Sequence, residues 1–155
     1  MRSTAFAELW VELLRSTAAR SGRPLVFGRG DNPINFVSVV DVAALVERAV
    51  VDAATRSKTL EIGGPDNLTF NQLARAVQDA DGRAGGPRHV PIGVLRVMAD
   101  TVGRLKPQVG RQARAAIAMD TVDLTFDAAV ARDAFPDLPC TTVAQVLAVD
   151  AQPVA

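Results

Sequence analysis

The chain has 155 residues, a formal net charge of zero and 48% apolar residues, enough for one domain with a substantial core. Its single cysteine, Cys140, excludes an internal disulfide and a metal site built from several cysteines. The basic residues are scattered along the sequence, which argues against nucleic acid or an anionic membrane surface as the main partner. No apolar run reaches the roughly 20 residues of a membrane span, and no signal peptide is recognisable, so we expect a cytoplasmic protein.

The first fifty residues predict two helices separated by two short strands. Gly22 is expected to end the first helix, whose apolar face is predicted to be Phe6, Leu9, Trp10, Leu13 and Leu14. Residues 25–27 and 36–39 predict the strands, with a turn cluster at 28–33 between them. We expect the second helix to begin at Asp41, whose carboxylate can accept hydrogen bonds from the first turn. The apolar face predicted for that helix is Val42, Leu45, Val46, Ala49 and Val50.

The middle of the chain predicts a buried strand, a capped helix and an edge strand. Residues 59–62 read as the buried strand, and Thr69 with Gln72 forms a capping box for a helix that Gly82 ends. After a link at 83–87, residues 88–91 predict an edge strand, since Pro91 cannot donate to a sheet ladder.

The remaining sequence is predominantly helical. Helices are predicted over 92–105 and from Pro107 to about Met119, followed by a short helix between Asp127 and Pro136. A second capping box, Thr142 with Gln145, begins a last helix that ends near Val149, and residues 151–155 are expected to be frayed. Alternating strands and helices indicate an α/β fold, but only 59–62 resembles a central strand, so residues 1–150 predict an incomplete unit.

Three segments of the sequence resemble a known superfamily. Residues 36–43, Phe-Val-Ser-Val-Val-Asp-Val-Ala, resemble the F-V-x-V-x-D-V-A segment of extended and atypical short-chain dehydrogenase/reductases. Residues 60–65 followed by 68–70 are similar to that superfamily's late strand, turn and capped helix. The tail at 119–121 resembles NmrA-like and NAD-dependent epimerase-like members in particular. The resemblance spans nearly the whole chain but only the C-terminal half of the family's length.

The resemblance implies an incomplete Rossmann-type unit, a helix-rich C-terminal, substrate-side part with a few short strands. In the complete parent, NAD(P) would bind to an N-terminal half carrying a Gly-x-x-Gly-x-x-Gly fingerprint, which would precede Met1. Any Tyr-x-x-x-Lys pair would lie there too, and this sequence contains no tyrosine. We therefore expect no cofactor and no catalytic competence for this chain alone, and leave open whether the parent performs redox turnover.

The resemblance also suggests which residues lie near the ligands. Arg2 and Ser3 would approach the cofactor's nicotinamide side. The residues expected to line the substrate cleft, as orienting rather than bond-making groups, are Gly28, Arg29, Gly30, Asn32, Asn35 and His89. No catalytic residue and no metal ligand is assigned.

Simpler interpretations compete at each of these positions. Gly28 and Gly30 fit a hairpin-like turn better than a phosphate cradle, because Asn32-Pro33 and a strand follow rather than a helix. His89 is the one histidine and the obvious acid–base candidate, but a structural or surface role is the more common one.

The remaining candidates have structural explanations as well. Asp41 is favoured as a helix cap over a catalytic base, and Cys140 as a packing residue over a nucleophile. Trp10 is expected in the core, with partial exposure if its helix borders the cleft. A cation bound by Asp120, Asp123 and Asp127 is less economical than capping and turns.

Two hypotheses of different classes follow. The chain is either the substrate-side segment of an NAD(P)-binding oxidoreductase or epimerase-like protein, or a non-catalytic interaction module. In the second case the strand edge at 59–62 would pair with a separately encoded N-terminal half or with a second copy.

Overall fold

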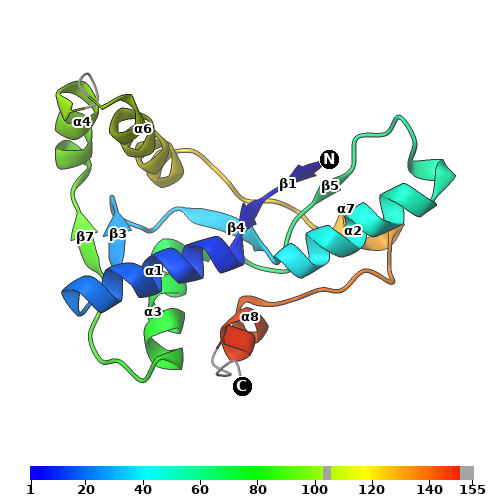
Figure 1. Ribbon diagram of the computed structural model, residues 1–155, viewed down its shortest axis with the longest axis horizontal. Coiled ribbons are helices and arrows are strands. Elements are labelled where there is room, and N and C mark those ends of the chain that lie inside the picture. Colours follow the sequence, from blue (N-terminus) through cyan, green and yellow to red (C-terminus); the bar gives the residue numbers. More distant parts are fainter. Residues whose placement is uncertain (103–105, 151–155) are drawn as a thin grey trace.

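The computed structural model describes residues 1–102 and 106–150, which form a mixed α/β fold with more helix than strand (Figure 1). The strands of this part of the chain are short and belong to three small sheets. The pairs are β1 (Arg2–Ser3) parallel to β5 (Glu61–Ile62), β3 (Leu25–Phe27) parallel to β7 (Arg88–Val90), and β4 (Pro33–Val37) parallel to β2 (Ala5–Phe6) and antiparallel to β6 (Asn67–Thr69).

Helices connect and cover these strands. They are α1 (Ala7–Ser21), α2 (Val39–Val51), the 3-10 turn η1 (Ala53–Thr55), α3 (Phe70–Ala80), α4 (Ile92–Asp100), α6 (Pro107–Thr121), α7 (Ala129–Ala134) and α8 (Val143–Asp150). None of the described helices is long and apolar enough to span a membrane.

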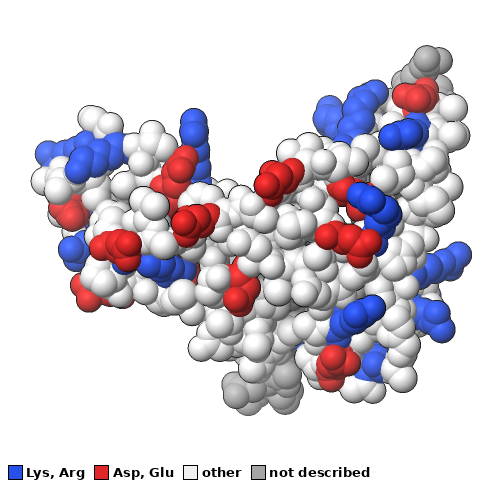
Figure 2. All heavy atoms as spheres, turned by 180° about the vertical axis from the view of Figure 1, so that it is seen from behind, with Lys and Arg blue, Asp and Glu red and all other residues white. Residues whose placement is uncertain are grey.

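Two groups of helices flank the short strands. In Figure 1, α4 and α6 pack together on one side, above α1. Strands β3 and β7 lie between this helix pair and α1. Helices α2 and α7 lie on the other side, with β1 and β5 between the groups. Figure 2 shows the surface hollowed between these two parts, with acidic and basic side chains interspersed rather than gathered by sign.

Most of the predicted helix ends are confirmed, because they depend on local chemistry. Gly22 adopts a left-handed φ of 76° and donates its N–H to Ala18. Thr69 and Gln72 form both hydrogen bonds of the capping box, and Thr142 and Gln145 repeat the arrangement. Pro107 begins α6, and the predicted end of the preceding helix at Leu105 lies outside the described residues.

The main core lies between α1, α3 and α8 and the strands β3 and β4. The face predicted for α1 is wrong at Leu9 and Leu13, which are 58% and 38% exposed. The buried positions are the predicted Leu14 together with Ala7, Val11 and Ala18, which were not predicted. These follow the i, i+4, i+7, i+11 spacing of one helix face, and the two alanines allow close packing. The rest of the predicted face is closer to the observed one, since Leu14 is buried and Trp10 packs, partly buried, against the same core.

Helix α2 begins two residues earlier than predicted. Its N-cap is Ser38, whose side chain accepts from the N–H of Val40, while Asp41 is the third helical residue. The predicted apolar face is also wrong in part, because Leu45 is buried but Val46 and Val50 are 45% and 79% exposed. The α2 stripe, an exposed apolar row at helical spacing, consists of Val39, Ala43, Val46 and Val50.

The strands differ from expectation mainly in their partners. The predicted strand at 36–39 is observed as β4, which begins earlier and ends at Val37, since Ser38 already caps α2. The predicted buried strand at 59–62 is reduced to β5, with Glu61 exposed and Ile62 buried. Strand β6 was not predicted. Its residues follow a turn-rich segment and are held by antiparallel pairing with β4, a long-range contact.

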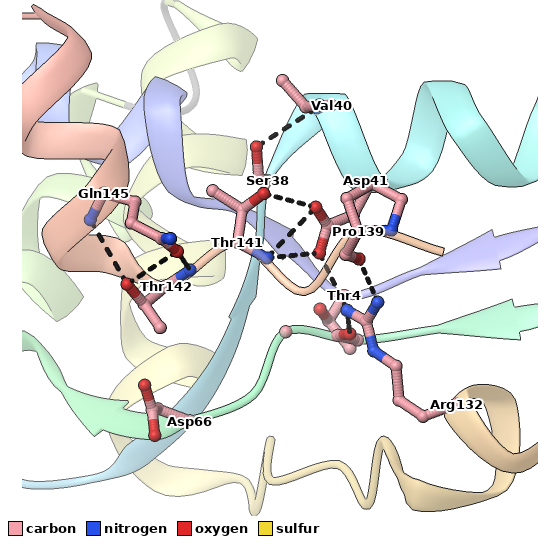
Figure 3. Close-up of polar contacts among 12 residues, drawn as sticks. Thr4, Ser38, Val40, Asp41, Asp66, Arg132, Pro139, Thr141, Thr142 and Gln145 are labelled. Atoms are coloured by element: carbon pink, nitrogen blue, oxygen red, sulfur yellow. Dashed lines mark hydrogen bonds and ion pairs between the residues drawn. The ribbon is translucent and has the colours of Figure 1, made fainter. Parts of the chain in front are cut away.

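Asp41 is the centre of a buried polar cluster rather than a helix cap (Figure 3). Its carboxylate, fully buried, accepts from Arg132 Nη2 at 2.8 Å and from the Thr141 hydroxyl at 2.6 Å. The Thr141 N–H also donates to it, at 3.1 Å, and Arg132 donates to the carbonyls of Gly63 and Pro139. Asp41 therefore fastens α7 and the segment before α8 to the start of α2.

We predict that Asp41→Asn lowers the free energy of unfolding by about 3 kcal/mol, because it leaves the Arg132 charge without its buried counter-ion. The asparagine NH₂ group would also face the donors of Thr141. Urea denaturation measures the loss, with Asp79→Asn at an exposed helical position as the control. Asparagine is itself a good cap, so equal stability of the two variants would restore the capping role of Asp41.

Candidate functional site

The turn after β3 is a small anion-binding turn built from backbone N–H groups. Gly28 and Gly30 adopt left-handed φ angles of 75° and 71°. This geometry directs the N–H groups of Arg29 and Gly30 to one point, where both donate to Asp120 Oδ1 at 3.0 and 2.9 Å. The turn therefore does bind an anion, but the anion is a carboxylate of the same chain.

Asp120 is enclosed by this turn and carries an unusually isolated oxygen. The residue is 3% exposed, and among the described residues nothing donates a hydrogen bond to its Oδ2. The Arg29 guanidinium, itself largely exposed, lies 3.7 Å from Oδ2 and partly neutralises it. A Cβ on Gly28 would lie 2.4 Å from the Asp120 Cγ, so only glycine fits there.

Asn32 and His89 support the same turn from outside. Asn32 Nδ2 donates to the carbonyls of Met119 and Val122 and so holds the end of α6 against the loop. Asn71 Nδ2 donates to the Arg29 carbonyl and to Asp31 Oδ1, which leaves its Oδ1 to face His89 Nε2 at 2.9 Å. Neutral His89 must therefore carry its proton on Nε2.

An apolar pocket of about 370 Å³ adjoins the turn. It lies between α1, α3, α4, α6 and β3, and its aromatic wall consists of Trp10, Phe27 and Phe70. Trp10 and Phe70 pack edge to face with ring centres 4.8 Å apart. Phe27 and Met119 line the pocket and directly precede Gly28 and Asp120, so the apolar site and the anion-binding turn are neighbours. The expected partial exposure of Trp10 is explained by this position.

The structure brings four of the predicted cleft residues, Gly28, Arg29, Gly30 and Asn32, to the turn beside this pocket. His89 contacts the turn through Asn71 but is exposed and aligns with buried Val26 rather than with Phe27, which lines the pocket. A sequence pattern could not reveal the pocket, because its wall combines residues from positions 10 to 119.

Asn35, Arg2 and Ser3 lie elsewhere. Asn35 is 1% exposed, and its amide bonds Thr4 and the backbone of Gly64 inside the protein. Arg2 and Ser3 form the exposed strand β1, where Arg2 makes a surface ion pair with Glu61 at 3.3 Å. None of the three lines the apolar pocket.

The three aspartates considered for a cation have separate structural uses. Asp120 occupies the turn, and Asp127 accepts from the N–H of Ala129 at the start of α7. The hydroxyl and N–H of Thr125 donate to Asp123 and hold the pKa of that carboxyl below its usual value. Within residues 1–102 and 106–150, no group of three or more His, Cys, Asp or Glu could hold a metal ion.

Cys140 is exposed, which corrects its expected packing role. It lines a shallow, open groove beside Arg132, Asn67 and Phe126. The guanidinium of Arg132 is already paired with Asp41, and Asp127 also lines the groove.

The chain has the Rossmann-like α/β fold of reductases and epimerases. No family model matches the sequence, and no curated protein matches it either.

Solved structures give the comparison. The NADPH-dependent quinone oxidoreductase QOR2 of Escherichia coli, complexed with NADPH, superposes with a TM-score of 0.74 at 18% identity, covering 97% of this chain and 52% of the enzyme. A nucleoside-diphosphate-sugar epimerase of Staphylococcus aureus gives 0.71 at 18% identity, covering 94% and 50%. The NADP(H) complex of Citrobacter sp. triphenylmethane reductase gives 0.72 at 15% identity, covering 96% and 51%. The chain thus spans about half the length of these structures.

We predict that Gly28→Ala lowers the free energy of unfolding by about 2 to 4 kcal/mol, because it adds a clash with Asp120 to the strain of a left-handed φ. Gly22→Ala is the matched control. Its φ is 76° with nothing near its Cβ position, so only about 1 kcal/mol is expected. Chemical denaturation of both variants isolates the clash.

The same pair in an Asp120→Ala background tests the partner directly, because removing the carboxylate should bring the cost of Gly28→Ala down to that of Gly22→Ala. Equal costs in the wild-type background would show that Asp120 does not occupy the turn.

Proposed function

We propose that this chain is the substrate-side, C-terminal part of an NAD(P)-binding oxidoreductase or epimerase-like protein. The observation that carries the proposal is the coverage: a neighbour matches 97% of this chain with about half of its own length. The resemblance of residues 36–43 and 60–70 to the later segments of such proteins indicates which half it is. A cytoplasmic setting is part of the same proposal.

The residues present do not fit a dinucleotide by themselves. The sequence contains no Gly-x-x-Gly-x-x-Gly fingerprint. The Gly28–Gly30 turn, which could cradle a phosphate, is filled by Asp120. In the complete protein the other half would bind NAD(P), Arg2 and Ser3 on β1 would approach it, and the apolar pocket would receive the substrate. Alone, the chain would be inactive.

A second candidate function is a non-catalytic interaction module, and two surface features favour it. The α2 stripe exposes valines that a lone domain has no reason to leave in water. The strand predicted at 59–62 is observed as β5, which among the described strands pairs with β1 alone, so the proposed pairing would extend this two-stranded sheet. The partner would be a separately encoded N-terminal half or a second copy of this chain.

The DNA preceding the codon for Met1 separates the two proposals. A coding stretch for the Gly-x-x-Gly-x-x-Gly fingerprint, in frame or displaced by a frameshift, would support the substrate-side part of a longer enzyme. An unrelated region there would favour the interaction module.

We predict that titrating the purified chain with NADH and with NADPH leaves the fluorescence of the nicotinamide unchanged, because the phosphate-type turn is occupied. The Escherichia coli NADPH-dependent quinone oxidoreductase serves as the positive control for the assay. Saturable binding in the micromolar range would contradict the proposal that the cofactor half is elsewhere.

We also predict that the chain binds an apolar-surface dye or elutes as an oligomer, and that Val46→Lys with Val50→Lys abolishes this behaviour. The matched control is Val130→Lys with Val149→Lys, two exposed valines on other helices. Size-exclusion chromatography and dye fluorescence provide the measurement. A sharply melting, monomeric wild type that ignores the dye would argue against any missing partner.

A further inference from the structure

We propose that the apolar pocket beside the Gly28–Gly30 turn binds an uncharged aromatic carbonyl compound and not a nucleotide sugar. The proposal rests on the proposed function in taking this pocket as the substrate site. It adds the chemical class of the ligand, which the fold does not supply, because reductases and nucleotide-sugar epimerases both share that fold.

The wall of the pocket is almost entirely apolar. Of the described residues that line it, none carries a formal charge, and the polar groups belong to the Gln112 amide and the Trp10 indole N–H. A charged ligand would lose its hydration here without gaining a counter-ion, which is costly. A volume of about 370 Å³ falls within the usual range for small-molecule sites.

Three aromatic rings line the pocket. Trp10, Phe27 and Phe70 contribute aromatic rings from three different elements, and Met98 and Met119 contribute flexible, polarisable side chains. Aromatic rings pack favourably in edge-to-face or offset geometry, and methionine adapts to a flat guest. Gln112, exposed at the pocket, has an amide N–H that can donate one hydrogen bond, and we assign this donor to the carbonyl oxygen of the ligand.

The turn beside the pocket also favours an uncharged ligand, for a reason that does not depend on the pocket wall. The anion-binding turn next to the pocket would be the natural place for a ligand phosphate, since two N–H groups converge on it. Asp120 occupies that position, and its second oxygen would repel a further anion. The Asp120 carboxylate therefore already occupies the two N–H groups that a ligand phosphate would need.

The test uses the single tryptophan as a reporter, since Trp10 lines the pocket and the chain has no tyrosine. The probes are 2-acetonaphthone, its anionic counterpart 2-naphthoate, and UDP-glucose, each titrated by calorimetry and followed by Trp10 fluorescence. We expect saturable binding of the ketone with a Kd on the order of tens of micromolar, typical for so small a ligand. Naphthoate should bind at least about tenfold more weakly, and UDP-glucose not at all.

Two variants on α6 locate the site. Ala116→Leu fills the pocket and should weaken ketone binding at least about tenfold, whereas Ala118→Leu, exposed on the same helix and outside the pocket, should leave the Kd unchanged. Gln112→Leu should weaken 2-acetonaphthone but not naphthalene, because only the ketone can accept its hydrogen bond. Circular dichroism of each variant excludes unfolding as the cause.

The outcomes distinguish this inference from the proposed function. Binding of UDP-glucose or naphthoate in preference to the ketone, or equal effects of Ala116→Leu and Ala118→Leu, would overturn the ligand class and leave the enzyme-part proposal standing. Ketone binding as expected, with no cofactor-binding sequence upstream of Met1, would support the pocket and contradict the enzyme-part proposal.

Discussion

The buried side chain of Asn35 connects three segments of the chain that are distant in sequence. Its Oδ1 accepts from the Thr4 hydroxyl and the Gly64 N–H, both at 2.8 Å, and its Nδ2 donates to the Gly64 carbonyl and to Asn67 Oδ1 at 3.1 Å. One buried amide thus holds the link between β1 and β2, strand β4 and the turn before β6 in register. The strands themselves are too short to do this, because a two-residue parallel pair supplies very few ladder hydrogen bonds.

Asp41 and Asp120 repeat this solution at two other places. Each is almost fully buried and accepts from backbone N–H groups of a segment far away in sequence: Thr141 for Asp41, and Arg29 with Gly30 for Asp120. Burying such groups is favourable only when they are paired, and breaking one bond leaves the other partners unsatisfied. Three polar side chains consequently fix loops that, in a long parallel sheet, neighbouring strands would fix.

This dependence explains how far the sequence could predict the structure. Signals that act within one turn of chain were reliable: the Thr69–Gln72 capping box, Pro107 at the start of α6, and Gly22 at the end of α1. Asp41 was misread as a cap because its partners lie 91 and 100 residues away, and no local rule reveals them. Likewise, Gly28 and Gly30 correctly predicted a turn, but only the fold shows that the N–H groups of this turn donate to Asp120. The pocket was missed for the same reason, since its wall is assembled from five elements.

Asp120 stabilises the Gly28–Gly30 turn and also lies next to the proposed ligand pocket. Asp120 satisfies the N–H groups of Arg29 and Gly30, so the loop after β3 needs no ligand to keep its left-handed glycines in place. The same carboxylate directly follows Met119, which lines the apolar pocket, and its charge is paired with Arg29, at 3.7 Å and largely exposed to water. In the proposed site, aromatic packing would strengthen the binding of a ligand, and a negative charge on the ligand would weaken it. The neutral ligand that we propose for the pocket is therefore consistent with how the loop is stabilised.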